Sequence, residues 1–568
     1  MKKLSILLCV MAVALFAVEH PNTWAGDDVG PHYSVPFNGY RQSPGYQVGV
    51  SDYDFWNNGS YGRYVCLTDV GGFHFYYTYE TGGDPNTRRA TYDYHFPPSY
   101  WLGQTTLDQD ASRMGALDQM PDGRGLGSAH ATVAGGYATR VYLDAAEGAG
   151  TFTILTLPDS GTATVPIWPE QVVDSAGVIY VIATPNINPP PHSYLSYSTD
   201  EGATWTPWDS MLGSFNITQD YLVGSGRETW GTSPDSRWTM LVSANGPFDA
   251  STGIYGFETD GLGTWYLNVI WETTASDSVK PWVYQSVVYG NDLYAHVVFD
   301  VIDTTTSAAP SQGSGKRSQI WHWYQSTGAI SQVDPGHGWV TTNPGCGVNH
   351  GTVSEPQLTI DKTTGDLYCT WTYGDPADTA ANGYINNDIW GARSTDNGVT
   401  WIQHHNITNS PSPGAASGSC DNDWYHTLAA ETIGDTLIIF YMNDKQAGSA
   451  VFQDATGYTD NPLLFYLYDW SLGVEENTTE APKRLSLNVA PNPSRRMTAL
   501  SYALPNAGNV SIKLYSVDGR LVENVYNGRR DAGVYTENVN ASQLANGTYF
   551  VVLETANEKI TSSLVVVR

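Results

Sequence analysis

Basic side chains are scarce in this sequence. Lys and Arg total 27 against 57 Asp and Glu, which gives a formal net charge of −30 over 568 residues. Such a chain repels phosphate backbones and anionic lipid headgroups, so nucleic acid and membrane surfaces are not expected partners. We interpret the acidity as a source of solubility outside the cell. Surface calcium sites are the alternative reading, but the sequence lacks a D-x-[DN]-x-[DN]-G loop with a distal glutamate, and no cofactor is expected.

Long apolar runs are also lacking beyond the N-terminus, so no transmembrane segment is expected. The exception is the start of the chain, where Lys2 and Lys3 precede an apolar stretch that runs from Leu4 to Val18. A short basic segment followed by such a stretch is typical of a secretory signal peptide. We therefore predict a signal peptide at 1–25, with cleavage between Ala17 and Ala25 and passage through the periplasm.

Cysteine is rare. Apart from Cys9 in the predicted signal peptide, the chain has only Cys66, Cys346, Cys369 and Cys420. An exported chain can oxidise its thiols, and four cysteines allow three pairings. Cys346 and Cys420 both lie in loops rich in Gly, Ser and Asn, so we expect this pair to form a disulfide first. No CxxC spacing exists, and no metal site is expected.

Turn-forming and aromatic residues are abundant by contrast. The chain contains 57 Gly and 31 Pro, aromatics make up 12% of it, and charged residues only 15%. This composition favours many short strands and tight turns over long charged helices. The length exceeds that of one ordinary core, so two or more domains or a large repeat array are expected.

One strand–turn–strand pattern recurs through the body of the chain. Each instance joins two segments rich in β-branched and aromatic residues through a hairpin-type turn. The instances are 65–80, 131–144, 172–184, 233–243, 287–299, 358–372 and 428–442. About seven irregular sheet units spaced about 40 to 75 residues apart indicate a β-propeller. We therefore predict an all-β fold with a propeller at 26–470, with six to eight blades and seven favoured.

Two segments in this body share the pattern Ser-Thr-Asp-x-Gly-x-Thr-Trp, and 257–265 holds a degraded third copy. The pattern resembles the Asp-box, or BNR repeat, on the outer hairpins of sialidase-like propellers. At a hairpin tip the Asp can accept backbone N–H bonds, the Gly can adopt positive φ, and the Trp can pack beneath the turn. We expect structural roles for Ser198, Asp200, Gly202, Trp205, Ser394, Asp396, Gly398 and Trp401.

The composition changes after Trp470. Residues 471–484 are polar and without a strand pattern, which is typical of a linker. Residues 485–568 alternate in period two between Gly, Asn and Asp turns, which predicts a small Ig-like β-sandwich.

Motifs in the last segment resemble the type IX secretion sorting domain, type A, over about 85 residues. They are Pro491-Asn492-Pro493, Asp518-Gly519-Arg520 and the Gly547-x-Tyr549 segment, followed by a terminal strand that ends at Arg568. The resemblance implies that the type IX machinery is a partner and that the protein is secreted or held at the cell surface.

Polar residues recur where the predicted innermost strands begin. The loops of several blades converge at this end of a propeller, and ligands approach it there. The candidates for such an axial mouth are His130, Glu170, Gln285, Glu355, Asp423 and His426. They could bind a polar ligand or supply paired carboxylates for glycosidic cleavage, and they could equally be strand-end residues bonded to neighbouring blades.

The resemblance to sialidases does not extend to their chemistry. That family uses a triad of arginines and an Arg-Ile-Pro segment, and this sequence has no such segment; Arg63 is the nearest analogue by position. No other catalytic signature was found, so catalytic residues are unassigned. Binding of a glycan, polymer or surface protein is the favoured function. A glycoside hydrolase acting on extracellular polysaccharide and a purely structural surface component remain open.

Overall fold

A computed structural model describes residues 43–567 with gaps. The gaps fall at 57–61, 98, 135, 159–165, 186–193, 211–227, 234–237, 245–251, 261–263, 275, 304–316, 335, 337–349, 451–457, 472–484, 491–493, 495–496, 505, 531–532 and 557. The predicted signal peptide, nearly all of the predicted linker, Cys346, the Pro491-Asn492-Pro493 motif and the centre of the degraded third repeat therefore lie outside the described residues.

The described chain is built from antiparallel strands, as its β-branched and aromatic composition predicts. Its helices are two single 3₁₀ turns, Pro85–Thr87 and Ala541–Gln543. In the described part of the chain, no helix is long and apolar enough to cross a bilayer.

Seven sheets of four or five strands occupy the described residues before the linker. The first contains β2 (Val65–Leu67), β3 (Phe73–Tyr79) and β4 (Arg89–Phe96), with β5 (Tyr100–Trp101) and β6 (Thr105–Thr106) both beside β4. In the second, β7 (Ser112–Arg113) and β8 (Leu117–Gln119) lie beside β9 (Gly125–Val133), followed by β10 (Gly136–Asp144) and β11 (Phe152–Thr156). The third contains β12 (Pro166–Val173), β13 (Ile179–Pro185), β14 (Tyr194–Ser198) and β15 (Asp209–Ser210).

The remaining four sheets repeat this order. The fourth contains β16 (Glu228–Thr232), β17 (Thr239–Ala244), β18 (Thr252–Thr259) and β19 (Trp265–Thr273). The fifth contains β20 (Val279–Tyr289), β21 (Ala295–Asp303), β22 (Ser318–Tyr324) and β23 (Ala329–Gln332). The sixth contains β24 (Val353–Ile360), β25 (Leu367–Thr379), β26 (Ile385–Ser394) and β27 (Ile402–Asn406), and the seventh β28 (Asn422–Leu428), β29 (Thr436–Asp444), β30 (Asn461–Asp469) and β1 (Tyr46–Ser51).

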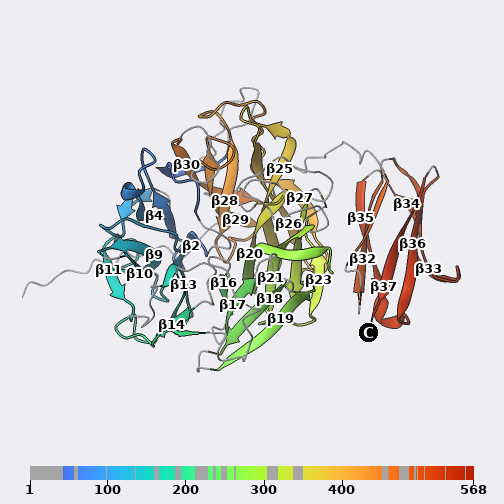
Figure 1. Ribbon diagram of the computed structural model, residues 1–568, viewed down its shortest axis with the longest axis horizontal. Helices are drawn as coiled ribbons and strands as arrows, with labels where there is room; N and C mark the ends of the chain where they lie inside the picture. The colour runs from blue at the N-terminus through green and yellow to red at the C-terminus, as the bar shows by residue number, and fades with distance from the viewer. Residues whose placement is uncertain are drawn as a thin grey trace, which may run out of the picture. The chain divides into compact units, whose positions relative to one another are not determined.

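Each sheet has an innermost strand, and we call these seven strands the first strands. They form a closed ring, which Figure 1 shows with the sheets radiating from it. In chain order β2, β8, β12, β16, β20, β24 and β28 each contact the next, and β28 contacts β2. The N-terminal strand β1 pairs with β30, so the start of the chain completes the last sheet. We call the centre of this ring the axis.

Hydrogen bonds between neighbouring first strands reinforce the ring. The backbone N–H of Leu358 on β24 donates to Ser286 on β20 (3.2 Å), and that of Tyr64, just before β2, donates to Thr427 on β28 (3.3 Å). Large apolar side chains fill the space between adjacent sheets, and most of them are buried completely. Polar side chains on the first strands therefore stabilise the contacts between neighbouring sheets.

Two further sheets lie at the C-terminus (Figure 1, red). One contains β31 (Ser486–Ala490), β32 (Met497–Leu504) and β35 (Gly533–Asn540), and the other β34 (Leu521–Arg530), β33 (Gly508–Ser516), β36 (Gly547–Glu554) and β37 (Lys559–Val566). Leu500 from the first sheet and Ile512, Val551 and Leu564 from the second share one apolar core. The period-two alternation of this segment thus buries one face of each sheet against the other.

Candidate functional site

Four of the first strands are interrupted at the same level. The pairing register of β12, β20, β24 and β28 with the second strand shifts near 167–170, 281–285, 354–357 and 424–427. Three non-glycine residues in these bulges have positive φ: Trp168 (52°), Glu355 (56°) and Tyr425 (49°). Bulges re-aim side chains, and positive φ at bulky residues stores strain that packing must hold. The bulges of β24 and β28 bring Glu355 and Tyr425 together, while Trp168 in the bulge of β12 packs on His130 and Met114.

Glu355 is the centre of this group. It is 0% exposed, its Oε2 accepts the backbone N–H of Tyr425 at 2.9 Å, and its Oε1 lies 3.0 Å from Nε2 of His350. The His350 ring packs against the rings of Tyr284 and Tyr425, with centroids 5.4 and 5.8 Å away. The carboxylate is thus held by two groups, the Tyr425 N–H and the His350 imidazole, and the imidazole is in turn packed between aromatic rings.

Tyr64 connects this group to the first sheet. Burial raises the pKa of its hydroxyl well above the ordinary value, and the nearby charges of Tyr76, Glu170 and Glu355 act in the same direction. Glu170 is buried as well, and its Oε2 lies 3.5 Å from the position that a Cβ on Gly62 would occupy. We call Tyr64, Glu170, Tyr284, His350, Glu355 and Tyr425 the axial cluster.

The predicted candidates divide between this cluster and other places. Glu170 and Glu355 belong to the cluster. His426 lies close to it, since the charge of Glu355 acts on its imidazole, and its Nε2 is 2.9 Å from the Thr370 hydroxyl. Gln285 follows the bulge of β20 and is buried. The structure therefore brings two of the six predicted residues together and a third alongside them.

Asp423 and His130 lie elsewhere. His130 is on β9, whose partners β7 and β8 form the inner edge of the second sheet, so it does not begin a first strand as the sequence predicts. Burial lowers its pKa to about 3. Asp423 does lie on β28, but its carboxylate accepts hydrogen bonds from Ser410 (2.8 Å) and Asn443 (2.8 Å), away from Glu355.

Residues 52–56, which we call the crossing segment, lead from β1 in the last sheet toward β2 in the first. All five are buried, none above 5% exposed. Asp54 accepts hydrogen bonds from the Ser449 hydroxyl (3.2 Å) and the Ala450 N–H. Trp56 stacks on Tyr425 (centroids 6.0 Å apart) and meets Tyr64 edge-on at 5.0 Å. Aromatic rings from this segment thus pack directly on the axial cluster.

Arg63 hydrogen-bonds to the first strands. Its guanidinium donates to the backbone carbonyls of Leu428 at 2.6 Å, Leu358 at 3.3 Å and Val287 at 3.4 Å. These acceptors belong to β28, β24 and β20, so one side chain joins three sheets. The guanidinium of Arg63, the nearest analogue by position of a sialidase arginine, is therefore bonded to the backbone.

The two Ser-Thr-Asp repeats form the same turn. Thr204 N–H donates to Asp200 at 2.8 Å, and the corresponding Thr400 N–H donates to Asp396 at 2.8 Å. The serine of each repeat, Ser198 and Ser394, accepts the glycine N–H at 2.8 Å. Gly202 (φ 81°) and Gly398 (φ 76°) have left-handed backbones, and a Cβ on Gly398 would lie 2.0 Å from His322. Trp401 is buried and Trp205 partly so.

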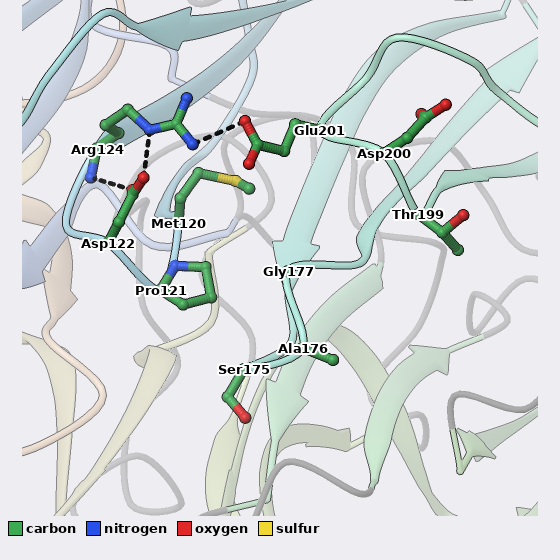
Figure 2. A pocket seen from close by; sticks show the side chains of 10 residues that line it. All are labelled: Met120, Pro121, Asp122, Arg124, Ser175, Ala176, Gly177, Thr199, Asp200 and Glu201. Atoms are coloured by element: carbon green, nitrogen blue, oxygen red, sulfur yellow. Dashed lines mark hydrogen bonds and ion pairs between the residues drawn. The ribbon is translucent and has the colours of Figure 1, made fainter.

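A cleft of about 500 Å³ borders the first of these turns, and Figure 2 shows the side chains that line it. Three turns form its walls, at 120–124, 175–177 and 199–201. Arg124 donates to Asp122 (2.7 Å) and Glu201 (2.8 Å). Asp200 is already engaged by Thr204. The cleft therefore contains one guanidinium and three carboxylates, so its lining is net negative.

The pKa of Asp423 on β28 can be tested through the pH dependence of stability. Burial, with the charge of Asp388 in addition, raises the pKa of its carboxyl to about 7 from 3.8. The native state thus binds the proton more tightly than the unfolded chain, and stability falls as pH rises from about 4 to about 7. We expect Asp423→Asn to have a flatter profile of unfolding free energy over this window, as measured by urea denaturation. An unchanged slope would show that Asp423 is ionised in the native protein throughout.

The described cysteines are buried. Cys420 packs against Ala380 and Ala447, and Cys66 and Cys369 lie in other clusters. In the described part of the chain, no group of three His, Cys, Asp or Glu side chains is placed to hold a metal ion. The Cys346–Cys420 disulfide stays a prediction.

The C-terminal sheets carry the remaining motif residues at their turns. Gly519 (φ 81°) donates its N–H to Ser516 O at 2.9 Å in the turn between β33 and β34, which contains Asp518 and Arg520. Gly547 (φ 150°) begins β36, where the Tyr549 hydroxyl donates to Ala545 O at 2.8 Å.

Residues 488–567 match the family model of the secretion system C-terminal sorting domain. The C-terminal pair of sheets is a type IX sorting domain. This confirms the prediction made from its motifs, and the chain is accordingly secreted to the cell surface or the surroundings.

Comparison of the whole chain adds distant likenesses. It is similar to the sialidase of Trypanosoma rangeli, with 9% identity over 86% of this chain and 89% of that one and a TM-score of 0.40. A Hadza microbial sialidase has 15% identity over 69% and 75% (TM-score 0.39). An α-L-arabinofuranosidase from Fusarium graminearum has 12% identity over 62% and 92% (TM-score 0.38). No curated protein matches the sequence.

Sequence reasoning missed most of the axial cluster. Tyr64, Tyr284, His350 and Tyr425 were not candidates, although Trp-x-x-Gln recurs at 168–171 and 282–285. That recurrence marks two of the bulges, so it was a usable signal. The sorting domain, in contrast, was found because its motifs are local turns.

Proposed function

We propose that the protein is a seven-bladed β-propeller followed by an Ig-like sorting domain, which binds an extracellular glycan without cleaving it. The closed ring of first strands and the pairing of β1 with β30 support the blade count. The sorting domain supplies the export route.

The burial of the axial carboxylates supports binding over hydrolysis. Glu355 is 0% and Glu170 2% exposed, and Glu355 is engaged by Tyr425 and His350. A glycosidase needs its two carboxyl groups on either side of a sugar, with solvent access for the attacking water. The crossing segment adds to this burial, because Trp56 packs on Tyr425 and Tyr64.

A glycoside hydrolase is the second candidate, because one observation favours it. Tyr64 lies in the electrostatic field of both Glu170 and Glu355, and Glu355 has a strained backbone. Perturbed groups and strain concentrate at catalytic sites. On this reading the crossing segment would have to move for substrate to enter.

The experiment is a panel of sialosides, other glycosides and polysaccharides, tested with the full secreted protein for product release and for retention. We expect retention without turnover, and the same retention for Glu355→Gln and Glu170→Gln, since amides of the same shape keep the packing. Turnover that disappears in either variant would overturn the proposal and place a catalytic centre at the axis.

A further inference from the structure

An indole ring on the outer edge of the first sheet is held against the fold and remains 37% exposed. Trp101 on β5 stands opposite His95 on β4, with ring centroids 3.9 Å apart and an angle of 17° between the planes. It also stacks with Phe75 at 6.0 Å. One side of the indole is therefore covered by fixed rings, and the exposed area belongs to the other side and the edge.

The ring beneath Trp101 is uncharged at neutral pH. His95 Nδ1 lies 2.8 Å from the carbonyl of Tyr100, which can only accept, so Nδ1 carries the proton and Nε2 is the acceptor nitrogen. Burial lowers the pKa of His95, and this outweighs the hydrogen bond to Tyr100, which raises it. The support of the indole is thus an apolar, neutral stack.

A second exposed aromatic ring lies on the neighbouring sheet, next to a residue that packs near His95. Tyr46 on β1 is 42% exposed and pairs directly with Phe465 on β30, so both side chains lie on one face of the last sheet. Phe465 lies 6.3 Å from His95, ring centre to ring centre. Tyr46 and Trp101 therefore flank one buried aromatic pair from neighbouring sheets.

The chemistry of the Trp101 and Tyr46 rings indicates which class of ligand they would bind. The C–H face of a pyranose ring is attracted to the negative face of an aromatic ring, and fixed rings lose little entropy on binding. A chain with a net charge of −30 disfavours sialylated, sulfated or uronate chains at long range. A protein partner fits poorly, because two side chains are far short of the roughly 800 Å² that each side of a stable interface buries.

We propose that Trp101 and Tyr46 form a stacking subsite for the pyranose rings of a neutral polysaccharide. The inference rests on the proposed function and gives it a place and a ligand class. Rings on two neighbouring sheets would engage separate sugars of one extended chain.

The test is the affinity of the full secreted protein for soluble neutral glucans, mannans and galactans, with polygalacturonate and a sialylated glycan beside them. Titration calorimetry measures it. We expect Trp101→Ala to bind the neutral chain at least about tenfold more weakly, and Trp101→Phe to retain most of the affinity, since a ring still stacks. Tyr266→Ala is the matched control: Tyr266 is 46% exposed on β19, the outermost strand of another sheet.

The outcomes separate the two proposals. Full affinity of Trp101→Ala with the fold intact, as judged by thermal unfolding, would overturn the subsite and leave glycan binding standing. Binding of only the anionic chains would overturn the ligand class. If the wild type bound no polysaccharide, glycan binding itself would fail.

Discussion

Replacing Trp56 by alanine is expected to lower the free energy of unfolding by about 4 kcal/mol. The ring is 2% exposed and packs between Tyr425, Phe440 and Tyr64 at centroid distances of 5.0 to 6.0 Å. Removing it leaves a cavity that these rings cannot fill, because Tyr425 and Phe440 are fixed in the last sheet and Tyr64 lies at the start of the first. Urea denaturation of the secreted protein, followed by tyrosine and tryptophan fluorescence, measures the change.

Ile154→Ala is a suitable control for this variant. Ile154 lies on β11 with 43% of its surface exposed, so its truncation should change stability by less than about 0.5 kcal/mol. The Trp56 variant should also be cut faster by protease within 52–56. If stability fell but cleavage there did not change, the crossing segment would be held by its other contacts, chiefly those of Asp54.

Arg63→Met is expected to cost about 3 kcal/mol, because three backbone carbonyls lose a charged donor at once. Methionine keeps most of the side chain's volume and removes the hydrogen bonds to Leu428, Leu358 and Val287. Water can reach part of this partly buried site, which keeps the effect below that of Trp56. The measurement is the urea midpoint, together with hydrogen exchange of β20, β24 and β28.

Arg124→Met is the control for Arg63→Met. It removes one positive charge but none of the hydrogen bonds to the first strands. Arg124 makes two ion pairs, but with exposed carboxylates on turns, where such pairs contribute less than about 1 kcal/mol. Equal destabilisation by the two variants would show that Arg63 contributes only its charge. If Arg63 joins β20, β24 and β28, hydrogen exchange in Arg63→Met should be faster in these three strands only.

Sequence patterns anticipated the local elements well. The segment 65–80 is the hairpin of β2 and β3, and 428–442 spans the junction of β28 and β29. The sorting domain was identified because its turns are encoded by adjacent residues such as Asp518-Gly519. Period-two alternation reports burial on one face, and that information is contained in a few consecutive residues.

The axial cluster could not be assembled in this way. Which sheet a strand joins depends on distant partners. The sequence around residues 52–56 therefore contains no pattern that predicts their burial by the last sheet. The sequence pattern predicts His130 on a first strand, and this is wrong because the inner edge of its sheet is formed by two short strands, β7 and β8. That break occurs where Met114 adopts φ 49° and a Cβ on Gly115 would lie 1.8 Å from Ser128 O. Backbone strain of this kind is fixed by packing, which no short segment reveals.

The pairing of β1 with β30 has a kinetic consequence. Ser43 and Asn443, which are hydrogen-bonded beside this junction, are 400 positions apart in the chain. Contacts between segments so far apart slow folding, so we expect the last sheet to be completed late, after the sheets built from neighbouring strands. Until then β30 offers an open edge to other chains. Refolding should therefore be slow and concentration-sensitive, with molecules whose rings are not closed exchanging β1.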